Sequence, residues 1–136
     1  MFRHEITLRI RYAETDQMGY VYYGNYATFY EVARTEMLRS TGISYKELED
    51  MGVMLPVTDL TCKYYQPARY DDLITIVTYI REKPLVRIKF EYEVFNAAGT
   101  LLNTGTTQLV FVDMAKNRPC KAPMVFQEKM TQFFPE

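Results

Sequence analysis

The first residues of the chain alternate between apolar and polar side chains, which is the pattern of a strand with one buried face. The apolar side of this pattern consists of Ile6, Leu8 and Ile10. The polar side carries a threonine and two arginines. The alternation therefore predicts a half-buried strand over residues 5–11.

From residue 25 the hydrophobic period changes to that of a helix. Along residues 25–41 apolar side chains recur three and four positions apart, namely Tyr26, Phe29, Tyr30, Ala33, Met37 and Leu38. This spacing predicts a long amphipathic helix that buries one stripe. Asn25 is placed to cap its start, and Gly42 is placed to end it. A short second helix is predicted over residues 44–51, with Ser44 as its N-cap.

The second half of the chain returns to the strand pattern. The predicted strands span residues 57–66, 73–80, 85–95 and 101–112. Residues 96–99 form a turn between the last two strands, and Pro123 opens a C-terminal helix. A strand, a long helix and four strands in this order predict one α+β domain over residues 1–136. Its five-stranded antiparallel sheet packs on the central helix.

Length and charge restrict the classes of protein to which the chain can belong. With 136 residues it has room for one core, and its 16 basic and 17 acidic side chains nearly balance. Such a balance does not favour a nucleic-acid partner. No apolar run approaches the roughly 20 residues that a membrane span needs, and the N-terminus alternates instead of forming a leader. We therefore expect a cytoplasmic protein with no membrane span.

The scarcity of histidine and cysteine limits the possible chemistry. The only histidine is His4, and the two cysteines, Cys62 and Cys120, match no metal-ligand spacing. A zinc site or a histidine-activated nucleophile is therefore not expected. Any catalysis depends on carboxylates, tyrosines, lysine or backbone dipoles.

One segment places a carboxylate shortly before the long helix. It reads Arg11-Tyr-Ala-Glu-Thr-Asp16-Gln-Met-Gly19-Tyr-Val-Tyr-Tyr23-Gly-Asn25-Tyr26. The start of a helix offers free backbone N–H groups that can hold an oxyanion. On local sequence alone, Asp16 is better explained as a turn residue that accepts hydrogen bonds from its own backbone.

This segment resembles a known family, the 4-hydroxybenzoyl-CoA thioesterase-type, YbgC-like acyl-CoA thioesterases. The matching pattern is Arg11-Tyr-x-x-Thr-Asp16-x-x-Gly19-x-Val21-x-Tyr23-x-x-Tyr26, followed by Phe29-Tyr-Glu-x-Ala-Arg-Thr-Glu36. Residues 66–72 also match the family's Pro-Ala-x-x-x-Asp turn. The resemblance implies the hotdog fold, a long central helix wrapped by an antiparallel sheet. It also implies hydrolysis of an acyl-CoA to a free acid and CoA, with no metal or organic cofactor.

The resemblance gives Asp16 the catalytic role, either as a nucleophile that forms an acyl-enzyme anhydride or as a general base on water. The sequence leaves both routes open. The backbone N–H of Tyr23, together with that of Gly24, would hold the carbonyl oxygen. Many members carry histidine where this chain has Tyr23, so the acyl group, aliphatic or aromatic, is also open. Glu31 is the alternative carboxylate, because related hotdog enzymes place an acid on the central helix.

Other residues are candidates for contacts with the substrate. The phosphates of CoA require basic groups, and candidates at strand ends or in loops include Lys63, Arg69, Lys116, Arg118 and Lys121. Each of these, taken singly, is better explained as solvated surface charge. Tyr64 is a candidate wall of the acyl pocket, and Gly19 and Asn25 are candidate contacts beside the carboxylate.

Two rival functions are compatible with the same fold. One is a hotdog dehydratase or hydratase, whose chemistry normally uses a histidine. The other is a silent acyl-CoA-binding module. The family resemblance also implies a homodimer whose sheet continues across both chains, often paired again into a homotetramer. The expected partners are thus a small-molecule acyl-CoA and further copies of this chain.

Overall fold

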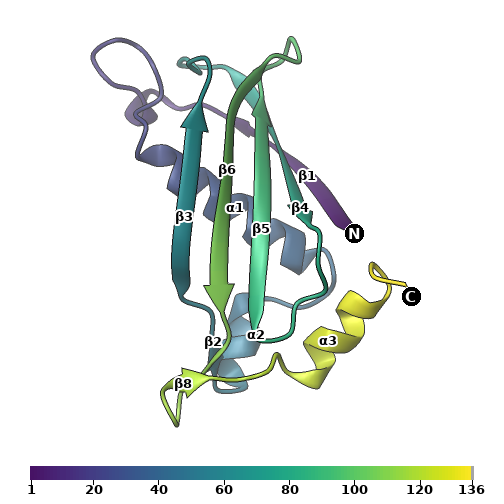
Figure 1. The fold of residues 1–136 in the computed structure, drawn as a ribbon. Coiled ribbons are helices and arrows are strands. Elements are labelled where there is room, and N and C mark those ends of the chain that lie inside the picture. Colours follow the sequence, from purple (N-terminus) through teal and green to yellow (C-terminus); the bar gives the residue numbers. More distant parts are fainter. Residues whose placement is uncertain (136) are drawn as a thin grey trace.

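The computed structural model describes residues 1–135, and its main element is a five-stranded antiparallel sheet with one long helix across a face (Figure 1). The helix is α1, Asn25–Arg39. The strands lie in the spatial order β1-β4-β5-β6-β3. Their bounds are β1 Phe2–Arg9, β3 Val57–Tyr64, β4 Leu73–Ile80, β5 Arg87–Phe95 and β6 Leu101–Val110. The predicted sheet and its central helix are thereby confirmed.

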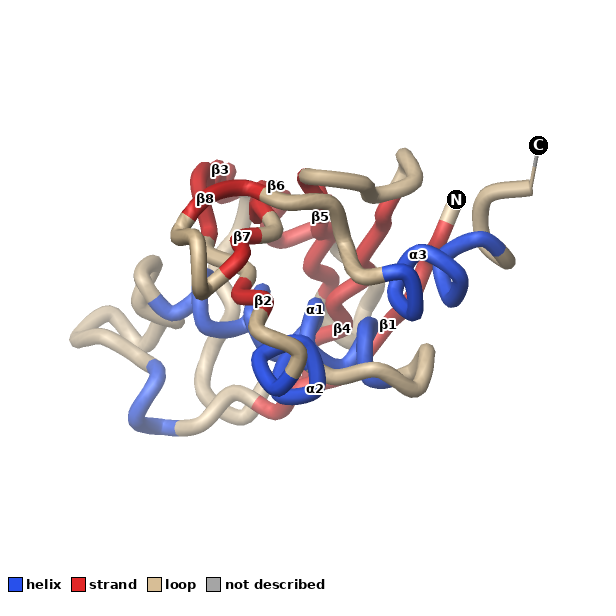
Figure 2. Tube along the Cα trace, turned by 90° about the horizontal axis from the view of Figure 1, so that it is seen from below, coloured by secondary structure: helices blue, strands red, loops and turns tan. Residues whose placement is uncertain are grey.

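Smaller elements close one end of this sheet (Figure 2). A second sheet has the order β2-β7-β8 and lies beside α2. The bounds are α2 Tyr45–Asp50, β2 Val53–Met54, β7 Val112–Asp113, β8 Arg118–Pro119 and α3 Met124–Thr131. Helix α3 lies beside the N-terminus, where the ring of Phe133 stacks on that of Phe2 with 3.8 Å between their centroids.

The structure corrects the predicted start of the long helix. The N-cap of α1 is Gly24, and Asn25 is already the first helical residue. The side-chain amide of Asn25 instead donates a hydrogen bond to the backbone oxygen of Glu14, at 2.8 Å. Asn25 therefore fastens the preceding loop to the helix and does not cap the helix. The predicted cap of α2 is confirmed, because the Ser44 hydroxyl accepts from the Glu47 N–H.

The predicted strand over residues 101–112 is broken in the structure. Strand β6 ends at Val110, and β7 starts at Val112 in the small sheet. Between them, the N–H of Phe111 donates to the Val86 oxygen at 2.9 Å, and its own oxygen accepts from Cys120. The apolar run at residues 109–112 hides this change of partner, because it continues without interruption across the break.

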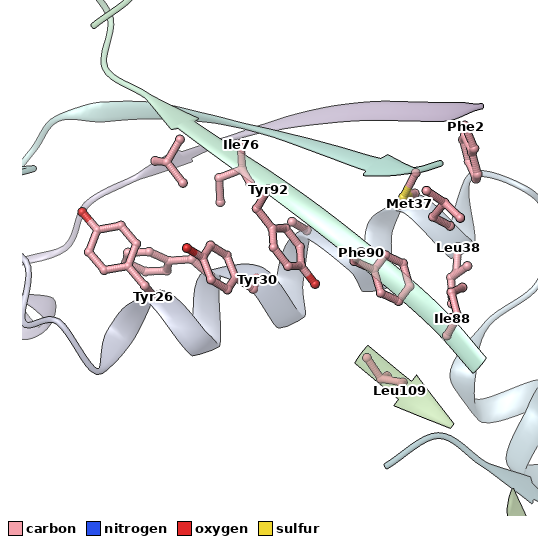
Figure 3. Close-up of a cluster of buried hydrophobic side chains, with 14 of the residues drawn as sticks. Phe2, Tyr26, Tyr30, Met37, Leu38, Ile76, Ile88, Phe90, Tyr92 and Leu109 are labelled. Carbon is pink, nitrogen blue, oxygen red and sulfur yellow. The ribbon is translucent and has the colours of Figure 1, made fainter. Parts of the chain in front are cut away.

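The core lies between α1 and the sheet (Figure 3). The ring of Tyr30 on α1 stacks on that of Tyr92 on β5, with 4.1 Å between centroids. Its hydroxyl donates to the side-chain oxygen of Asn103 and lies 3.3 Å from the sulfur of Cys62. A Cβ at Gly105 would overlap that hydroxyl, so only glycine permits this approach.

The buried tyrosines predict a loss of stability at alkaline pH. Burial raises the pKa of Tyr26 to about 12, and it also raises the pKa values of Tyr30 and Tyr92 above the usual 10.0. Above pH 10 the unfolded chain loses these protons while the folded chain keeps them, so the free energy of unfolding falls as pH rises. Below pH 10 their contribution is complete. Denaturant titrations between about pH 8 and pH 11, with tyrosinate absorbance, measure this loss. An unfolding free energy that is constant over that range contradicts it.

Candidate active site

The loop that carries Asp16 is a tight turn held by its own backbone. Thr15 and Val21 form an isolated antiparallel bridge across its base. The Asp16 N–H donates to the Tyr20 oxygen at 2.8 Å. In return, the Asp16 side-chain Oδ1 accepts from the N–H groups of Met18, at 2.9 Å, and Tyr20, at 3.2 Å. The loop therefore fixes the position of the carboxylate.

Only one oxygen of this carboxylate is used by the turn. Within residues 1–135 no hydrogen bond reaches the second oxygen, Oδ2. The side chain is half-buried, and Gly19 completes the turn with a φ of +77°, in the region that favours glycine. Asp16 is thus a turn residue whose other oxygen has no protein partner among the described residues.

The start of α1 presents two free backbone donors. The Asn25 N–H donates to the Tyr22 oxygen at 2.9 Å, and the Tyr26 N–H donates to the Tyr23 oxygen at 3.3 Å. In the part of the chain that the structure describes, the N–H groups of Tyr23 and Gly24 have no acceptor. Adjacent free donors at the positive end of a helix form a site for an oxyanion.

Asp16 and the start of α1 border the same pocket, which has a volume of about 290 Å³. Half of its wall residues are tyrosines, and the wall consists of Asp16, Met18, Tyr20, Val21, Tyr23, Tyr26, Tyr64, Tyr65, Gln66 and Pro67. Tyr26 is only 3% exposed and meets the edge of the Tyr64 ring, with 5.5 Å between centroids. The pocket therefore joins one carboxylate to a wall rich in tyrosine.

The turn at residues 66–72 supports the Asp16 loop from the side. The Val21 N–H donates to the oxygen of the fully buried Ala68, at 2.8 Å. Tyr20 and Arg69 form an isolated bridge, and the Arg69 guanidinium lies 4.7 Å from the centroid of the Tyr20 ring. Arg69 is therefore a cation next to the pocket wall.

The other candidates lie elsewhere. Lys63 borders a separate hollow of about 340 Å³, on the face of the sheet turned away from α1. Arg118 is on β8, at the opposite end of the molecule from the loop before α1 (Figure 1). Glu31 is exposed on α1 and is not part of the pocket wall.

Of the predicted residues, Asp16, Tyr23 and Tyr64 border the pocket together. Gly19 and Gly24 directly follow the wall residues Met18 and Tyr23 in the chain. Sequence reasoning missed Tyr20, Gln66 and Pro67 as wall residues and counted Tyr26 only as core. The match at residues 66–72 was the available signal, because it indicated that this turn belongs to the motif. Nothing in the sequence indicated that the turn lies beside the Asp16 loop.

No group of three or more His, Cys, Asp or Glu side chains in residues 1–135 could hold a metal ion. None of the helices in this range is long and apolar enough to span a bilayer.

Comparison with known proteins identifies the family. The sequence model of the Thioesterase-like superfamily matches residues 10–130. The chain is 40% identical over 116 residues to the acyl-CoA thioester hydrolase YbgC of Escherichia coli O157:H7, a match that covers 85% of this chain and 87% of YbgC. It is 32% identical over 126 residues to the putative acyl-CoA thioesterase YneP of Bacillus subtilis, over 93% of this chain and 91% of YneP.

Solved structures agree with this result. The DHNA-CoA thioesterase of Staphylococcus aureus superposes with a TM-score of 0.84 at 34% identity, over 99% of this chain and 85% of that one. The two proteins share a long helix across a five-stranded antiparallel sheet, and the superposition covers nearly the whole of this chain. The chain belongs to the thioesterase-like superfamily and has its hotdog fold.

Proposed function

We propose that this enzyme hydrolyses an acyl-CoA thioester to a free acid and CoA in the pocket beside Asp16. The observation that carries the proposal is the shared pocket. It is bordered by a carboxylate with one unbonded oxygen and by Tyr23, whose N–H is a free donor at the start of α1. The names of the relatives, YbgC, YneP and the Staphylococcus aureus enzyme, support CoA thioesters as the substrate class.

Two routes use the same Asp16 oxygen. In the first, Oδ2 attacks the thioester carbon, the C–S bond breaks, and CoA thiolate leaves. Water then cleaves the resulting anhydride and restores the carboxylate. In the second, Oδ2 takes a proton from a water that attacks the same carbon, and the proton passes to the departing thiolate. Both routes end in the free acid and CoA.

The carbonyl oxygen becomes negative in either route, and the N–H groups of Tyr23 and Gly24 are our candidates to stabilise it. Such donors are effective because they are fixed before the charge develops. Glu31 remains the less favoured carboxylate, because its side chain is exposed and does not border the pocket. Arg69, next to the pocket wall, is the candidate for contact with a CoA phosphate.

The size and wall of the pocket favour a compact acyl group. A cavity of about 150 Å³ accommodates a benzene molecule, so about 290 Å³ has room for one ring and the thioester. Tyrosine edges and faces suit a flat ring, because aromatic pairs prefer edge-on or offset contacts. The rival dehydratase chemistry is disfavoured, because His4 lies on β1 and does not border this pocket.

We further propose that the active form is a homodimer joined along β3, with a homotetramer as the larger assembly. Strand β3 ends the order of the sheet, so one of its edges has no partner strand in residues 1–135. Three of its apolar side chains, Val57, Leu60 and Tyr64, are about half exposed. An exposed apolar edge strand favours pairing with a second copy, and Tyr64 places that edge next to the pocket.

Replacing Asp16 with asparagine tests the catalytic carboxylate. The amide oxygen of Asn can accept the same N–H bonds, so the loop is kept while the charge is lost. We expect kcat to fall by about 100-fold or more. The assay follows free thiol released from aliphatic and aromatic acyl-CoAs, with Asp50→Asn, on the exposed surface of α2, as the control. Undiminished hydrolysis by Asp16→Asn excludes the assignment, and CoA binding without hydrolysis by the wild type indicates a binding module.

Tyr23→Pro tests the backbone donor. Tyr23 is the second residue of the turn closed by Tyr22 and Asn25, a position where proline is favoured, and proline has no N–H. We expect kcat to fall by about 10²–10³. Tyr23→Ala removes the side chain but keeps the N–H, so it should retain more activity than the proline variant. Equal losses in both variants would assign the role to the ring instead.

Leu60→Asp tests the proposed dimer. A carboxylate on β3 should separate the two copies, and activity should fall together with sedimentation mass. Leu85→Asp is the control, because Leu85 is exposed to a similar extent, 45% against 48%, but precedes β5. A Leu60→Asp protein that sediments and hydrolyses like the wild type would contradict the dimer.

A further inference from the structure

Tyr64 makes a contact that joins the edge of the sheet to the start of α1. It is the last residue of β3, and its hydroxyl donates to the backbone oxygen of Tyr23 at 3.2 Å. Among the described residues, this is the one side-chain hydrogen bond between the turn at residues 22–25 and the sheet. The two residues are 41 positions apart in the chain, so only the tertiary fold brings them together.

The acceptor of this bond belongs to the same peptide unit as a candidate oxyanion donor. The Tyr23 oxygen and the Gly24 N–H are the two polar ends of one peptide group. The structure has no cis peptide bond in residues 1–135, and in a planar trans peptide the C=O and N–H point in opposite directions. A contact that fixes the carbonyl therefore fixes the direction of the Gly24 N–H. Accepting a hydrogen bond also polarises the peptide and strengthens its N–H as a donor.

The helix alone holds this peptide weakly. Its carbonyl accepts from the Tyr26 N–H at 3.3 Å, which is long for a helical bond, and Gly24 has no side chain to restrict the turn. The Tyr64 hydroxyl supplies the second hydrogen bond to the same oxygen. The carbonyl can accept both, because it has two lone pairs.

The position of Tyr64 is itself fixed by neighbouring rings. Its ring meets Tyr26 at 73° and Tyr23 at 84°, with centroid distances of 5.5 Å and 6.5 Å. The Tyr26 ring is buried, so its packing in the core prevents it from moving away from Tyr64. Burial, with a smaller effect from the neighbouring Cys62 thiol, raises the pKa of Tyr64, so its hydroxyl keeps the proton that it donates.

We propose that Tyr64 is a positioning residue for the hydrolysis: by holding the Tyr23 carbonyl, its hydroxyl aims the Gly24 N–H at the thioester oxygen. The inference rests on the proposed function. It differs from a role as pocket wall, because it depends on the hydroxyl and not on the ring.

Tyr64→Phe separates the two roles, since phenylalanine keeps the ring and removes the hydroxyl. We expect kcat for benzoyl-CoA and butyryl-CoA to fall about tenfold, in line with the loss of one hydrogen bond. KM should change by less than about twofold, because the aimed donor acts mainly on the charge of the transition state. Tyr12→Phe, at an exposed tyrosine outside the pocket, is the matched control.

A second measurement follows the Gly24 amide by ¹⁵N–¹H NMR. We expect its proton resonance to shift in Tyr64→Phe and to stay in place in Tyr12→Phe. An unchanged kcat, a change confined to KM, or an unmoved Gly24 resonance overturns the positioning role. Failure of the proposed function is distinguishable from this, because the wild type would then hydrolyse neither thioester.

Discussion

The burial of one aromatic stripe of α1 against the sheet is the constraint on which the rest of the structure depends. Each large apolar side chain removed from water contributes about 1.5–3 kcal/mol, and Tyr26, Phe29 and Tyr30 all lie in this contact. Gly105 allows Tyr30 to reach β3 and β6 with its hydroxyl, which fixes how closely the helix approaches. Once the helix is fixed, its N-terminal end must lie beside the edge strand β3.

That placement explains why the candidate chemistry gathers in one pocket. After β1 the chain must turn back to reach the start of α1. It does so through a turn whose backbone hydrogen bonds hold Asp16 in place. The same loop ends in two free N–H groups, because α1 begins with a tight turn that leaves them outside its own bonding pattern. The tyrosines then line the pocket and, at Tyr64, provide a hydrogen bond from the sheet to the helix start. The position of the Asp16 carboxylate and the presence of free N–H donors beside it therefore both follow from the packing of one helix.

Much of the fold was predictable from hydrophobic spacing alone. Strand β4 has the predicted bounds, the alternation in β5 identifies its buried residues, and the cap at Ser44 follows from its side chain. The cap predicted at Asn25 was wrong, because a distant acceptor, the Glu14 oxygen, takes its amide. The break at Phe111 was missed because residues 109–112 are all apolar, so that hydrophobic spacing does not mark a change of sheet.

The sequence by itself determined the long helix, the five strands of the main sheet and the family, because these depend on local periodicity and on a contiguous motif. It also singled out Asp16, Tyr23 and Gly24, which are close together in the chain. Only the tertiary structure decided which distant residues join them: residues 66–67 and Tyr64 border the pocket, whereas Lys63 and Arg118 do not. The physical reason is that contacts between remote segments follow from the packing of the helix on the sheet. The order of residues along the chain does not say how far apart such segments lie in space.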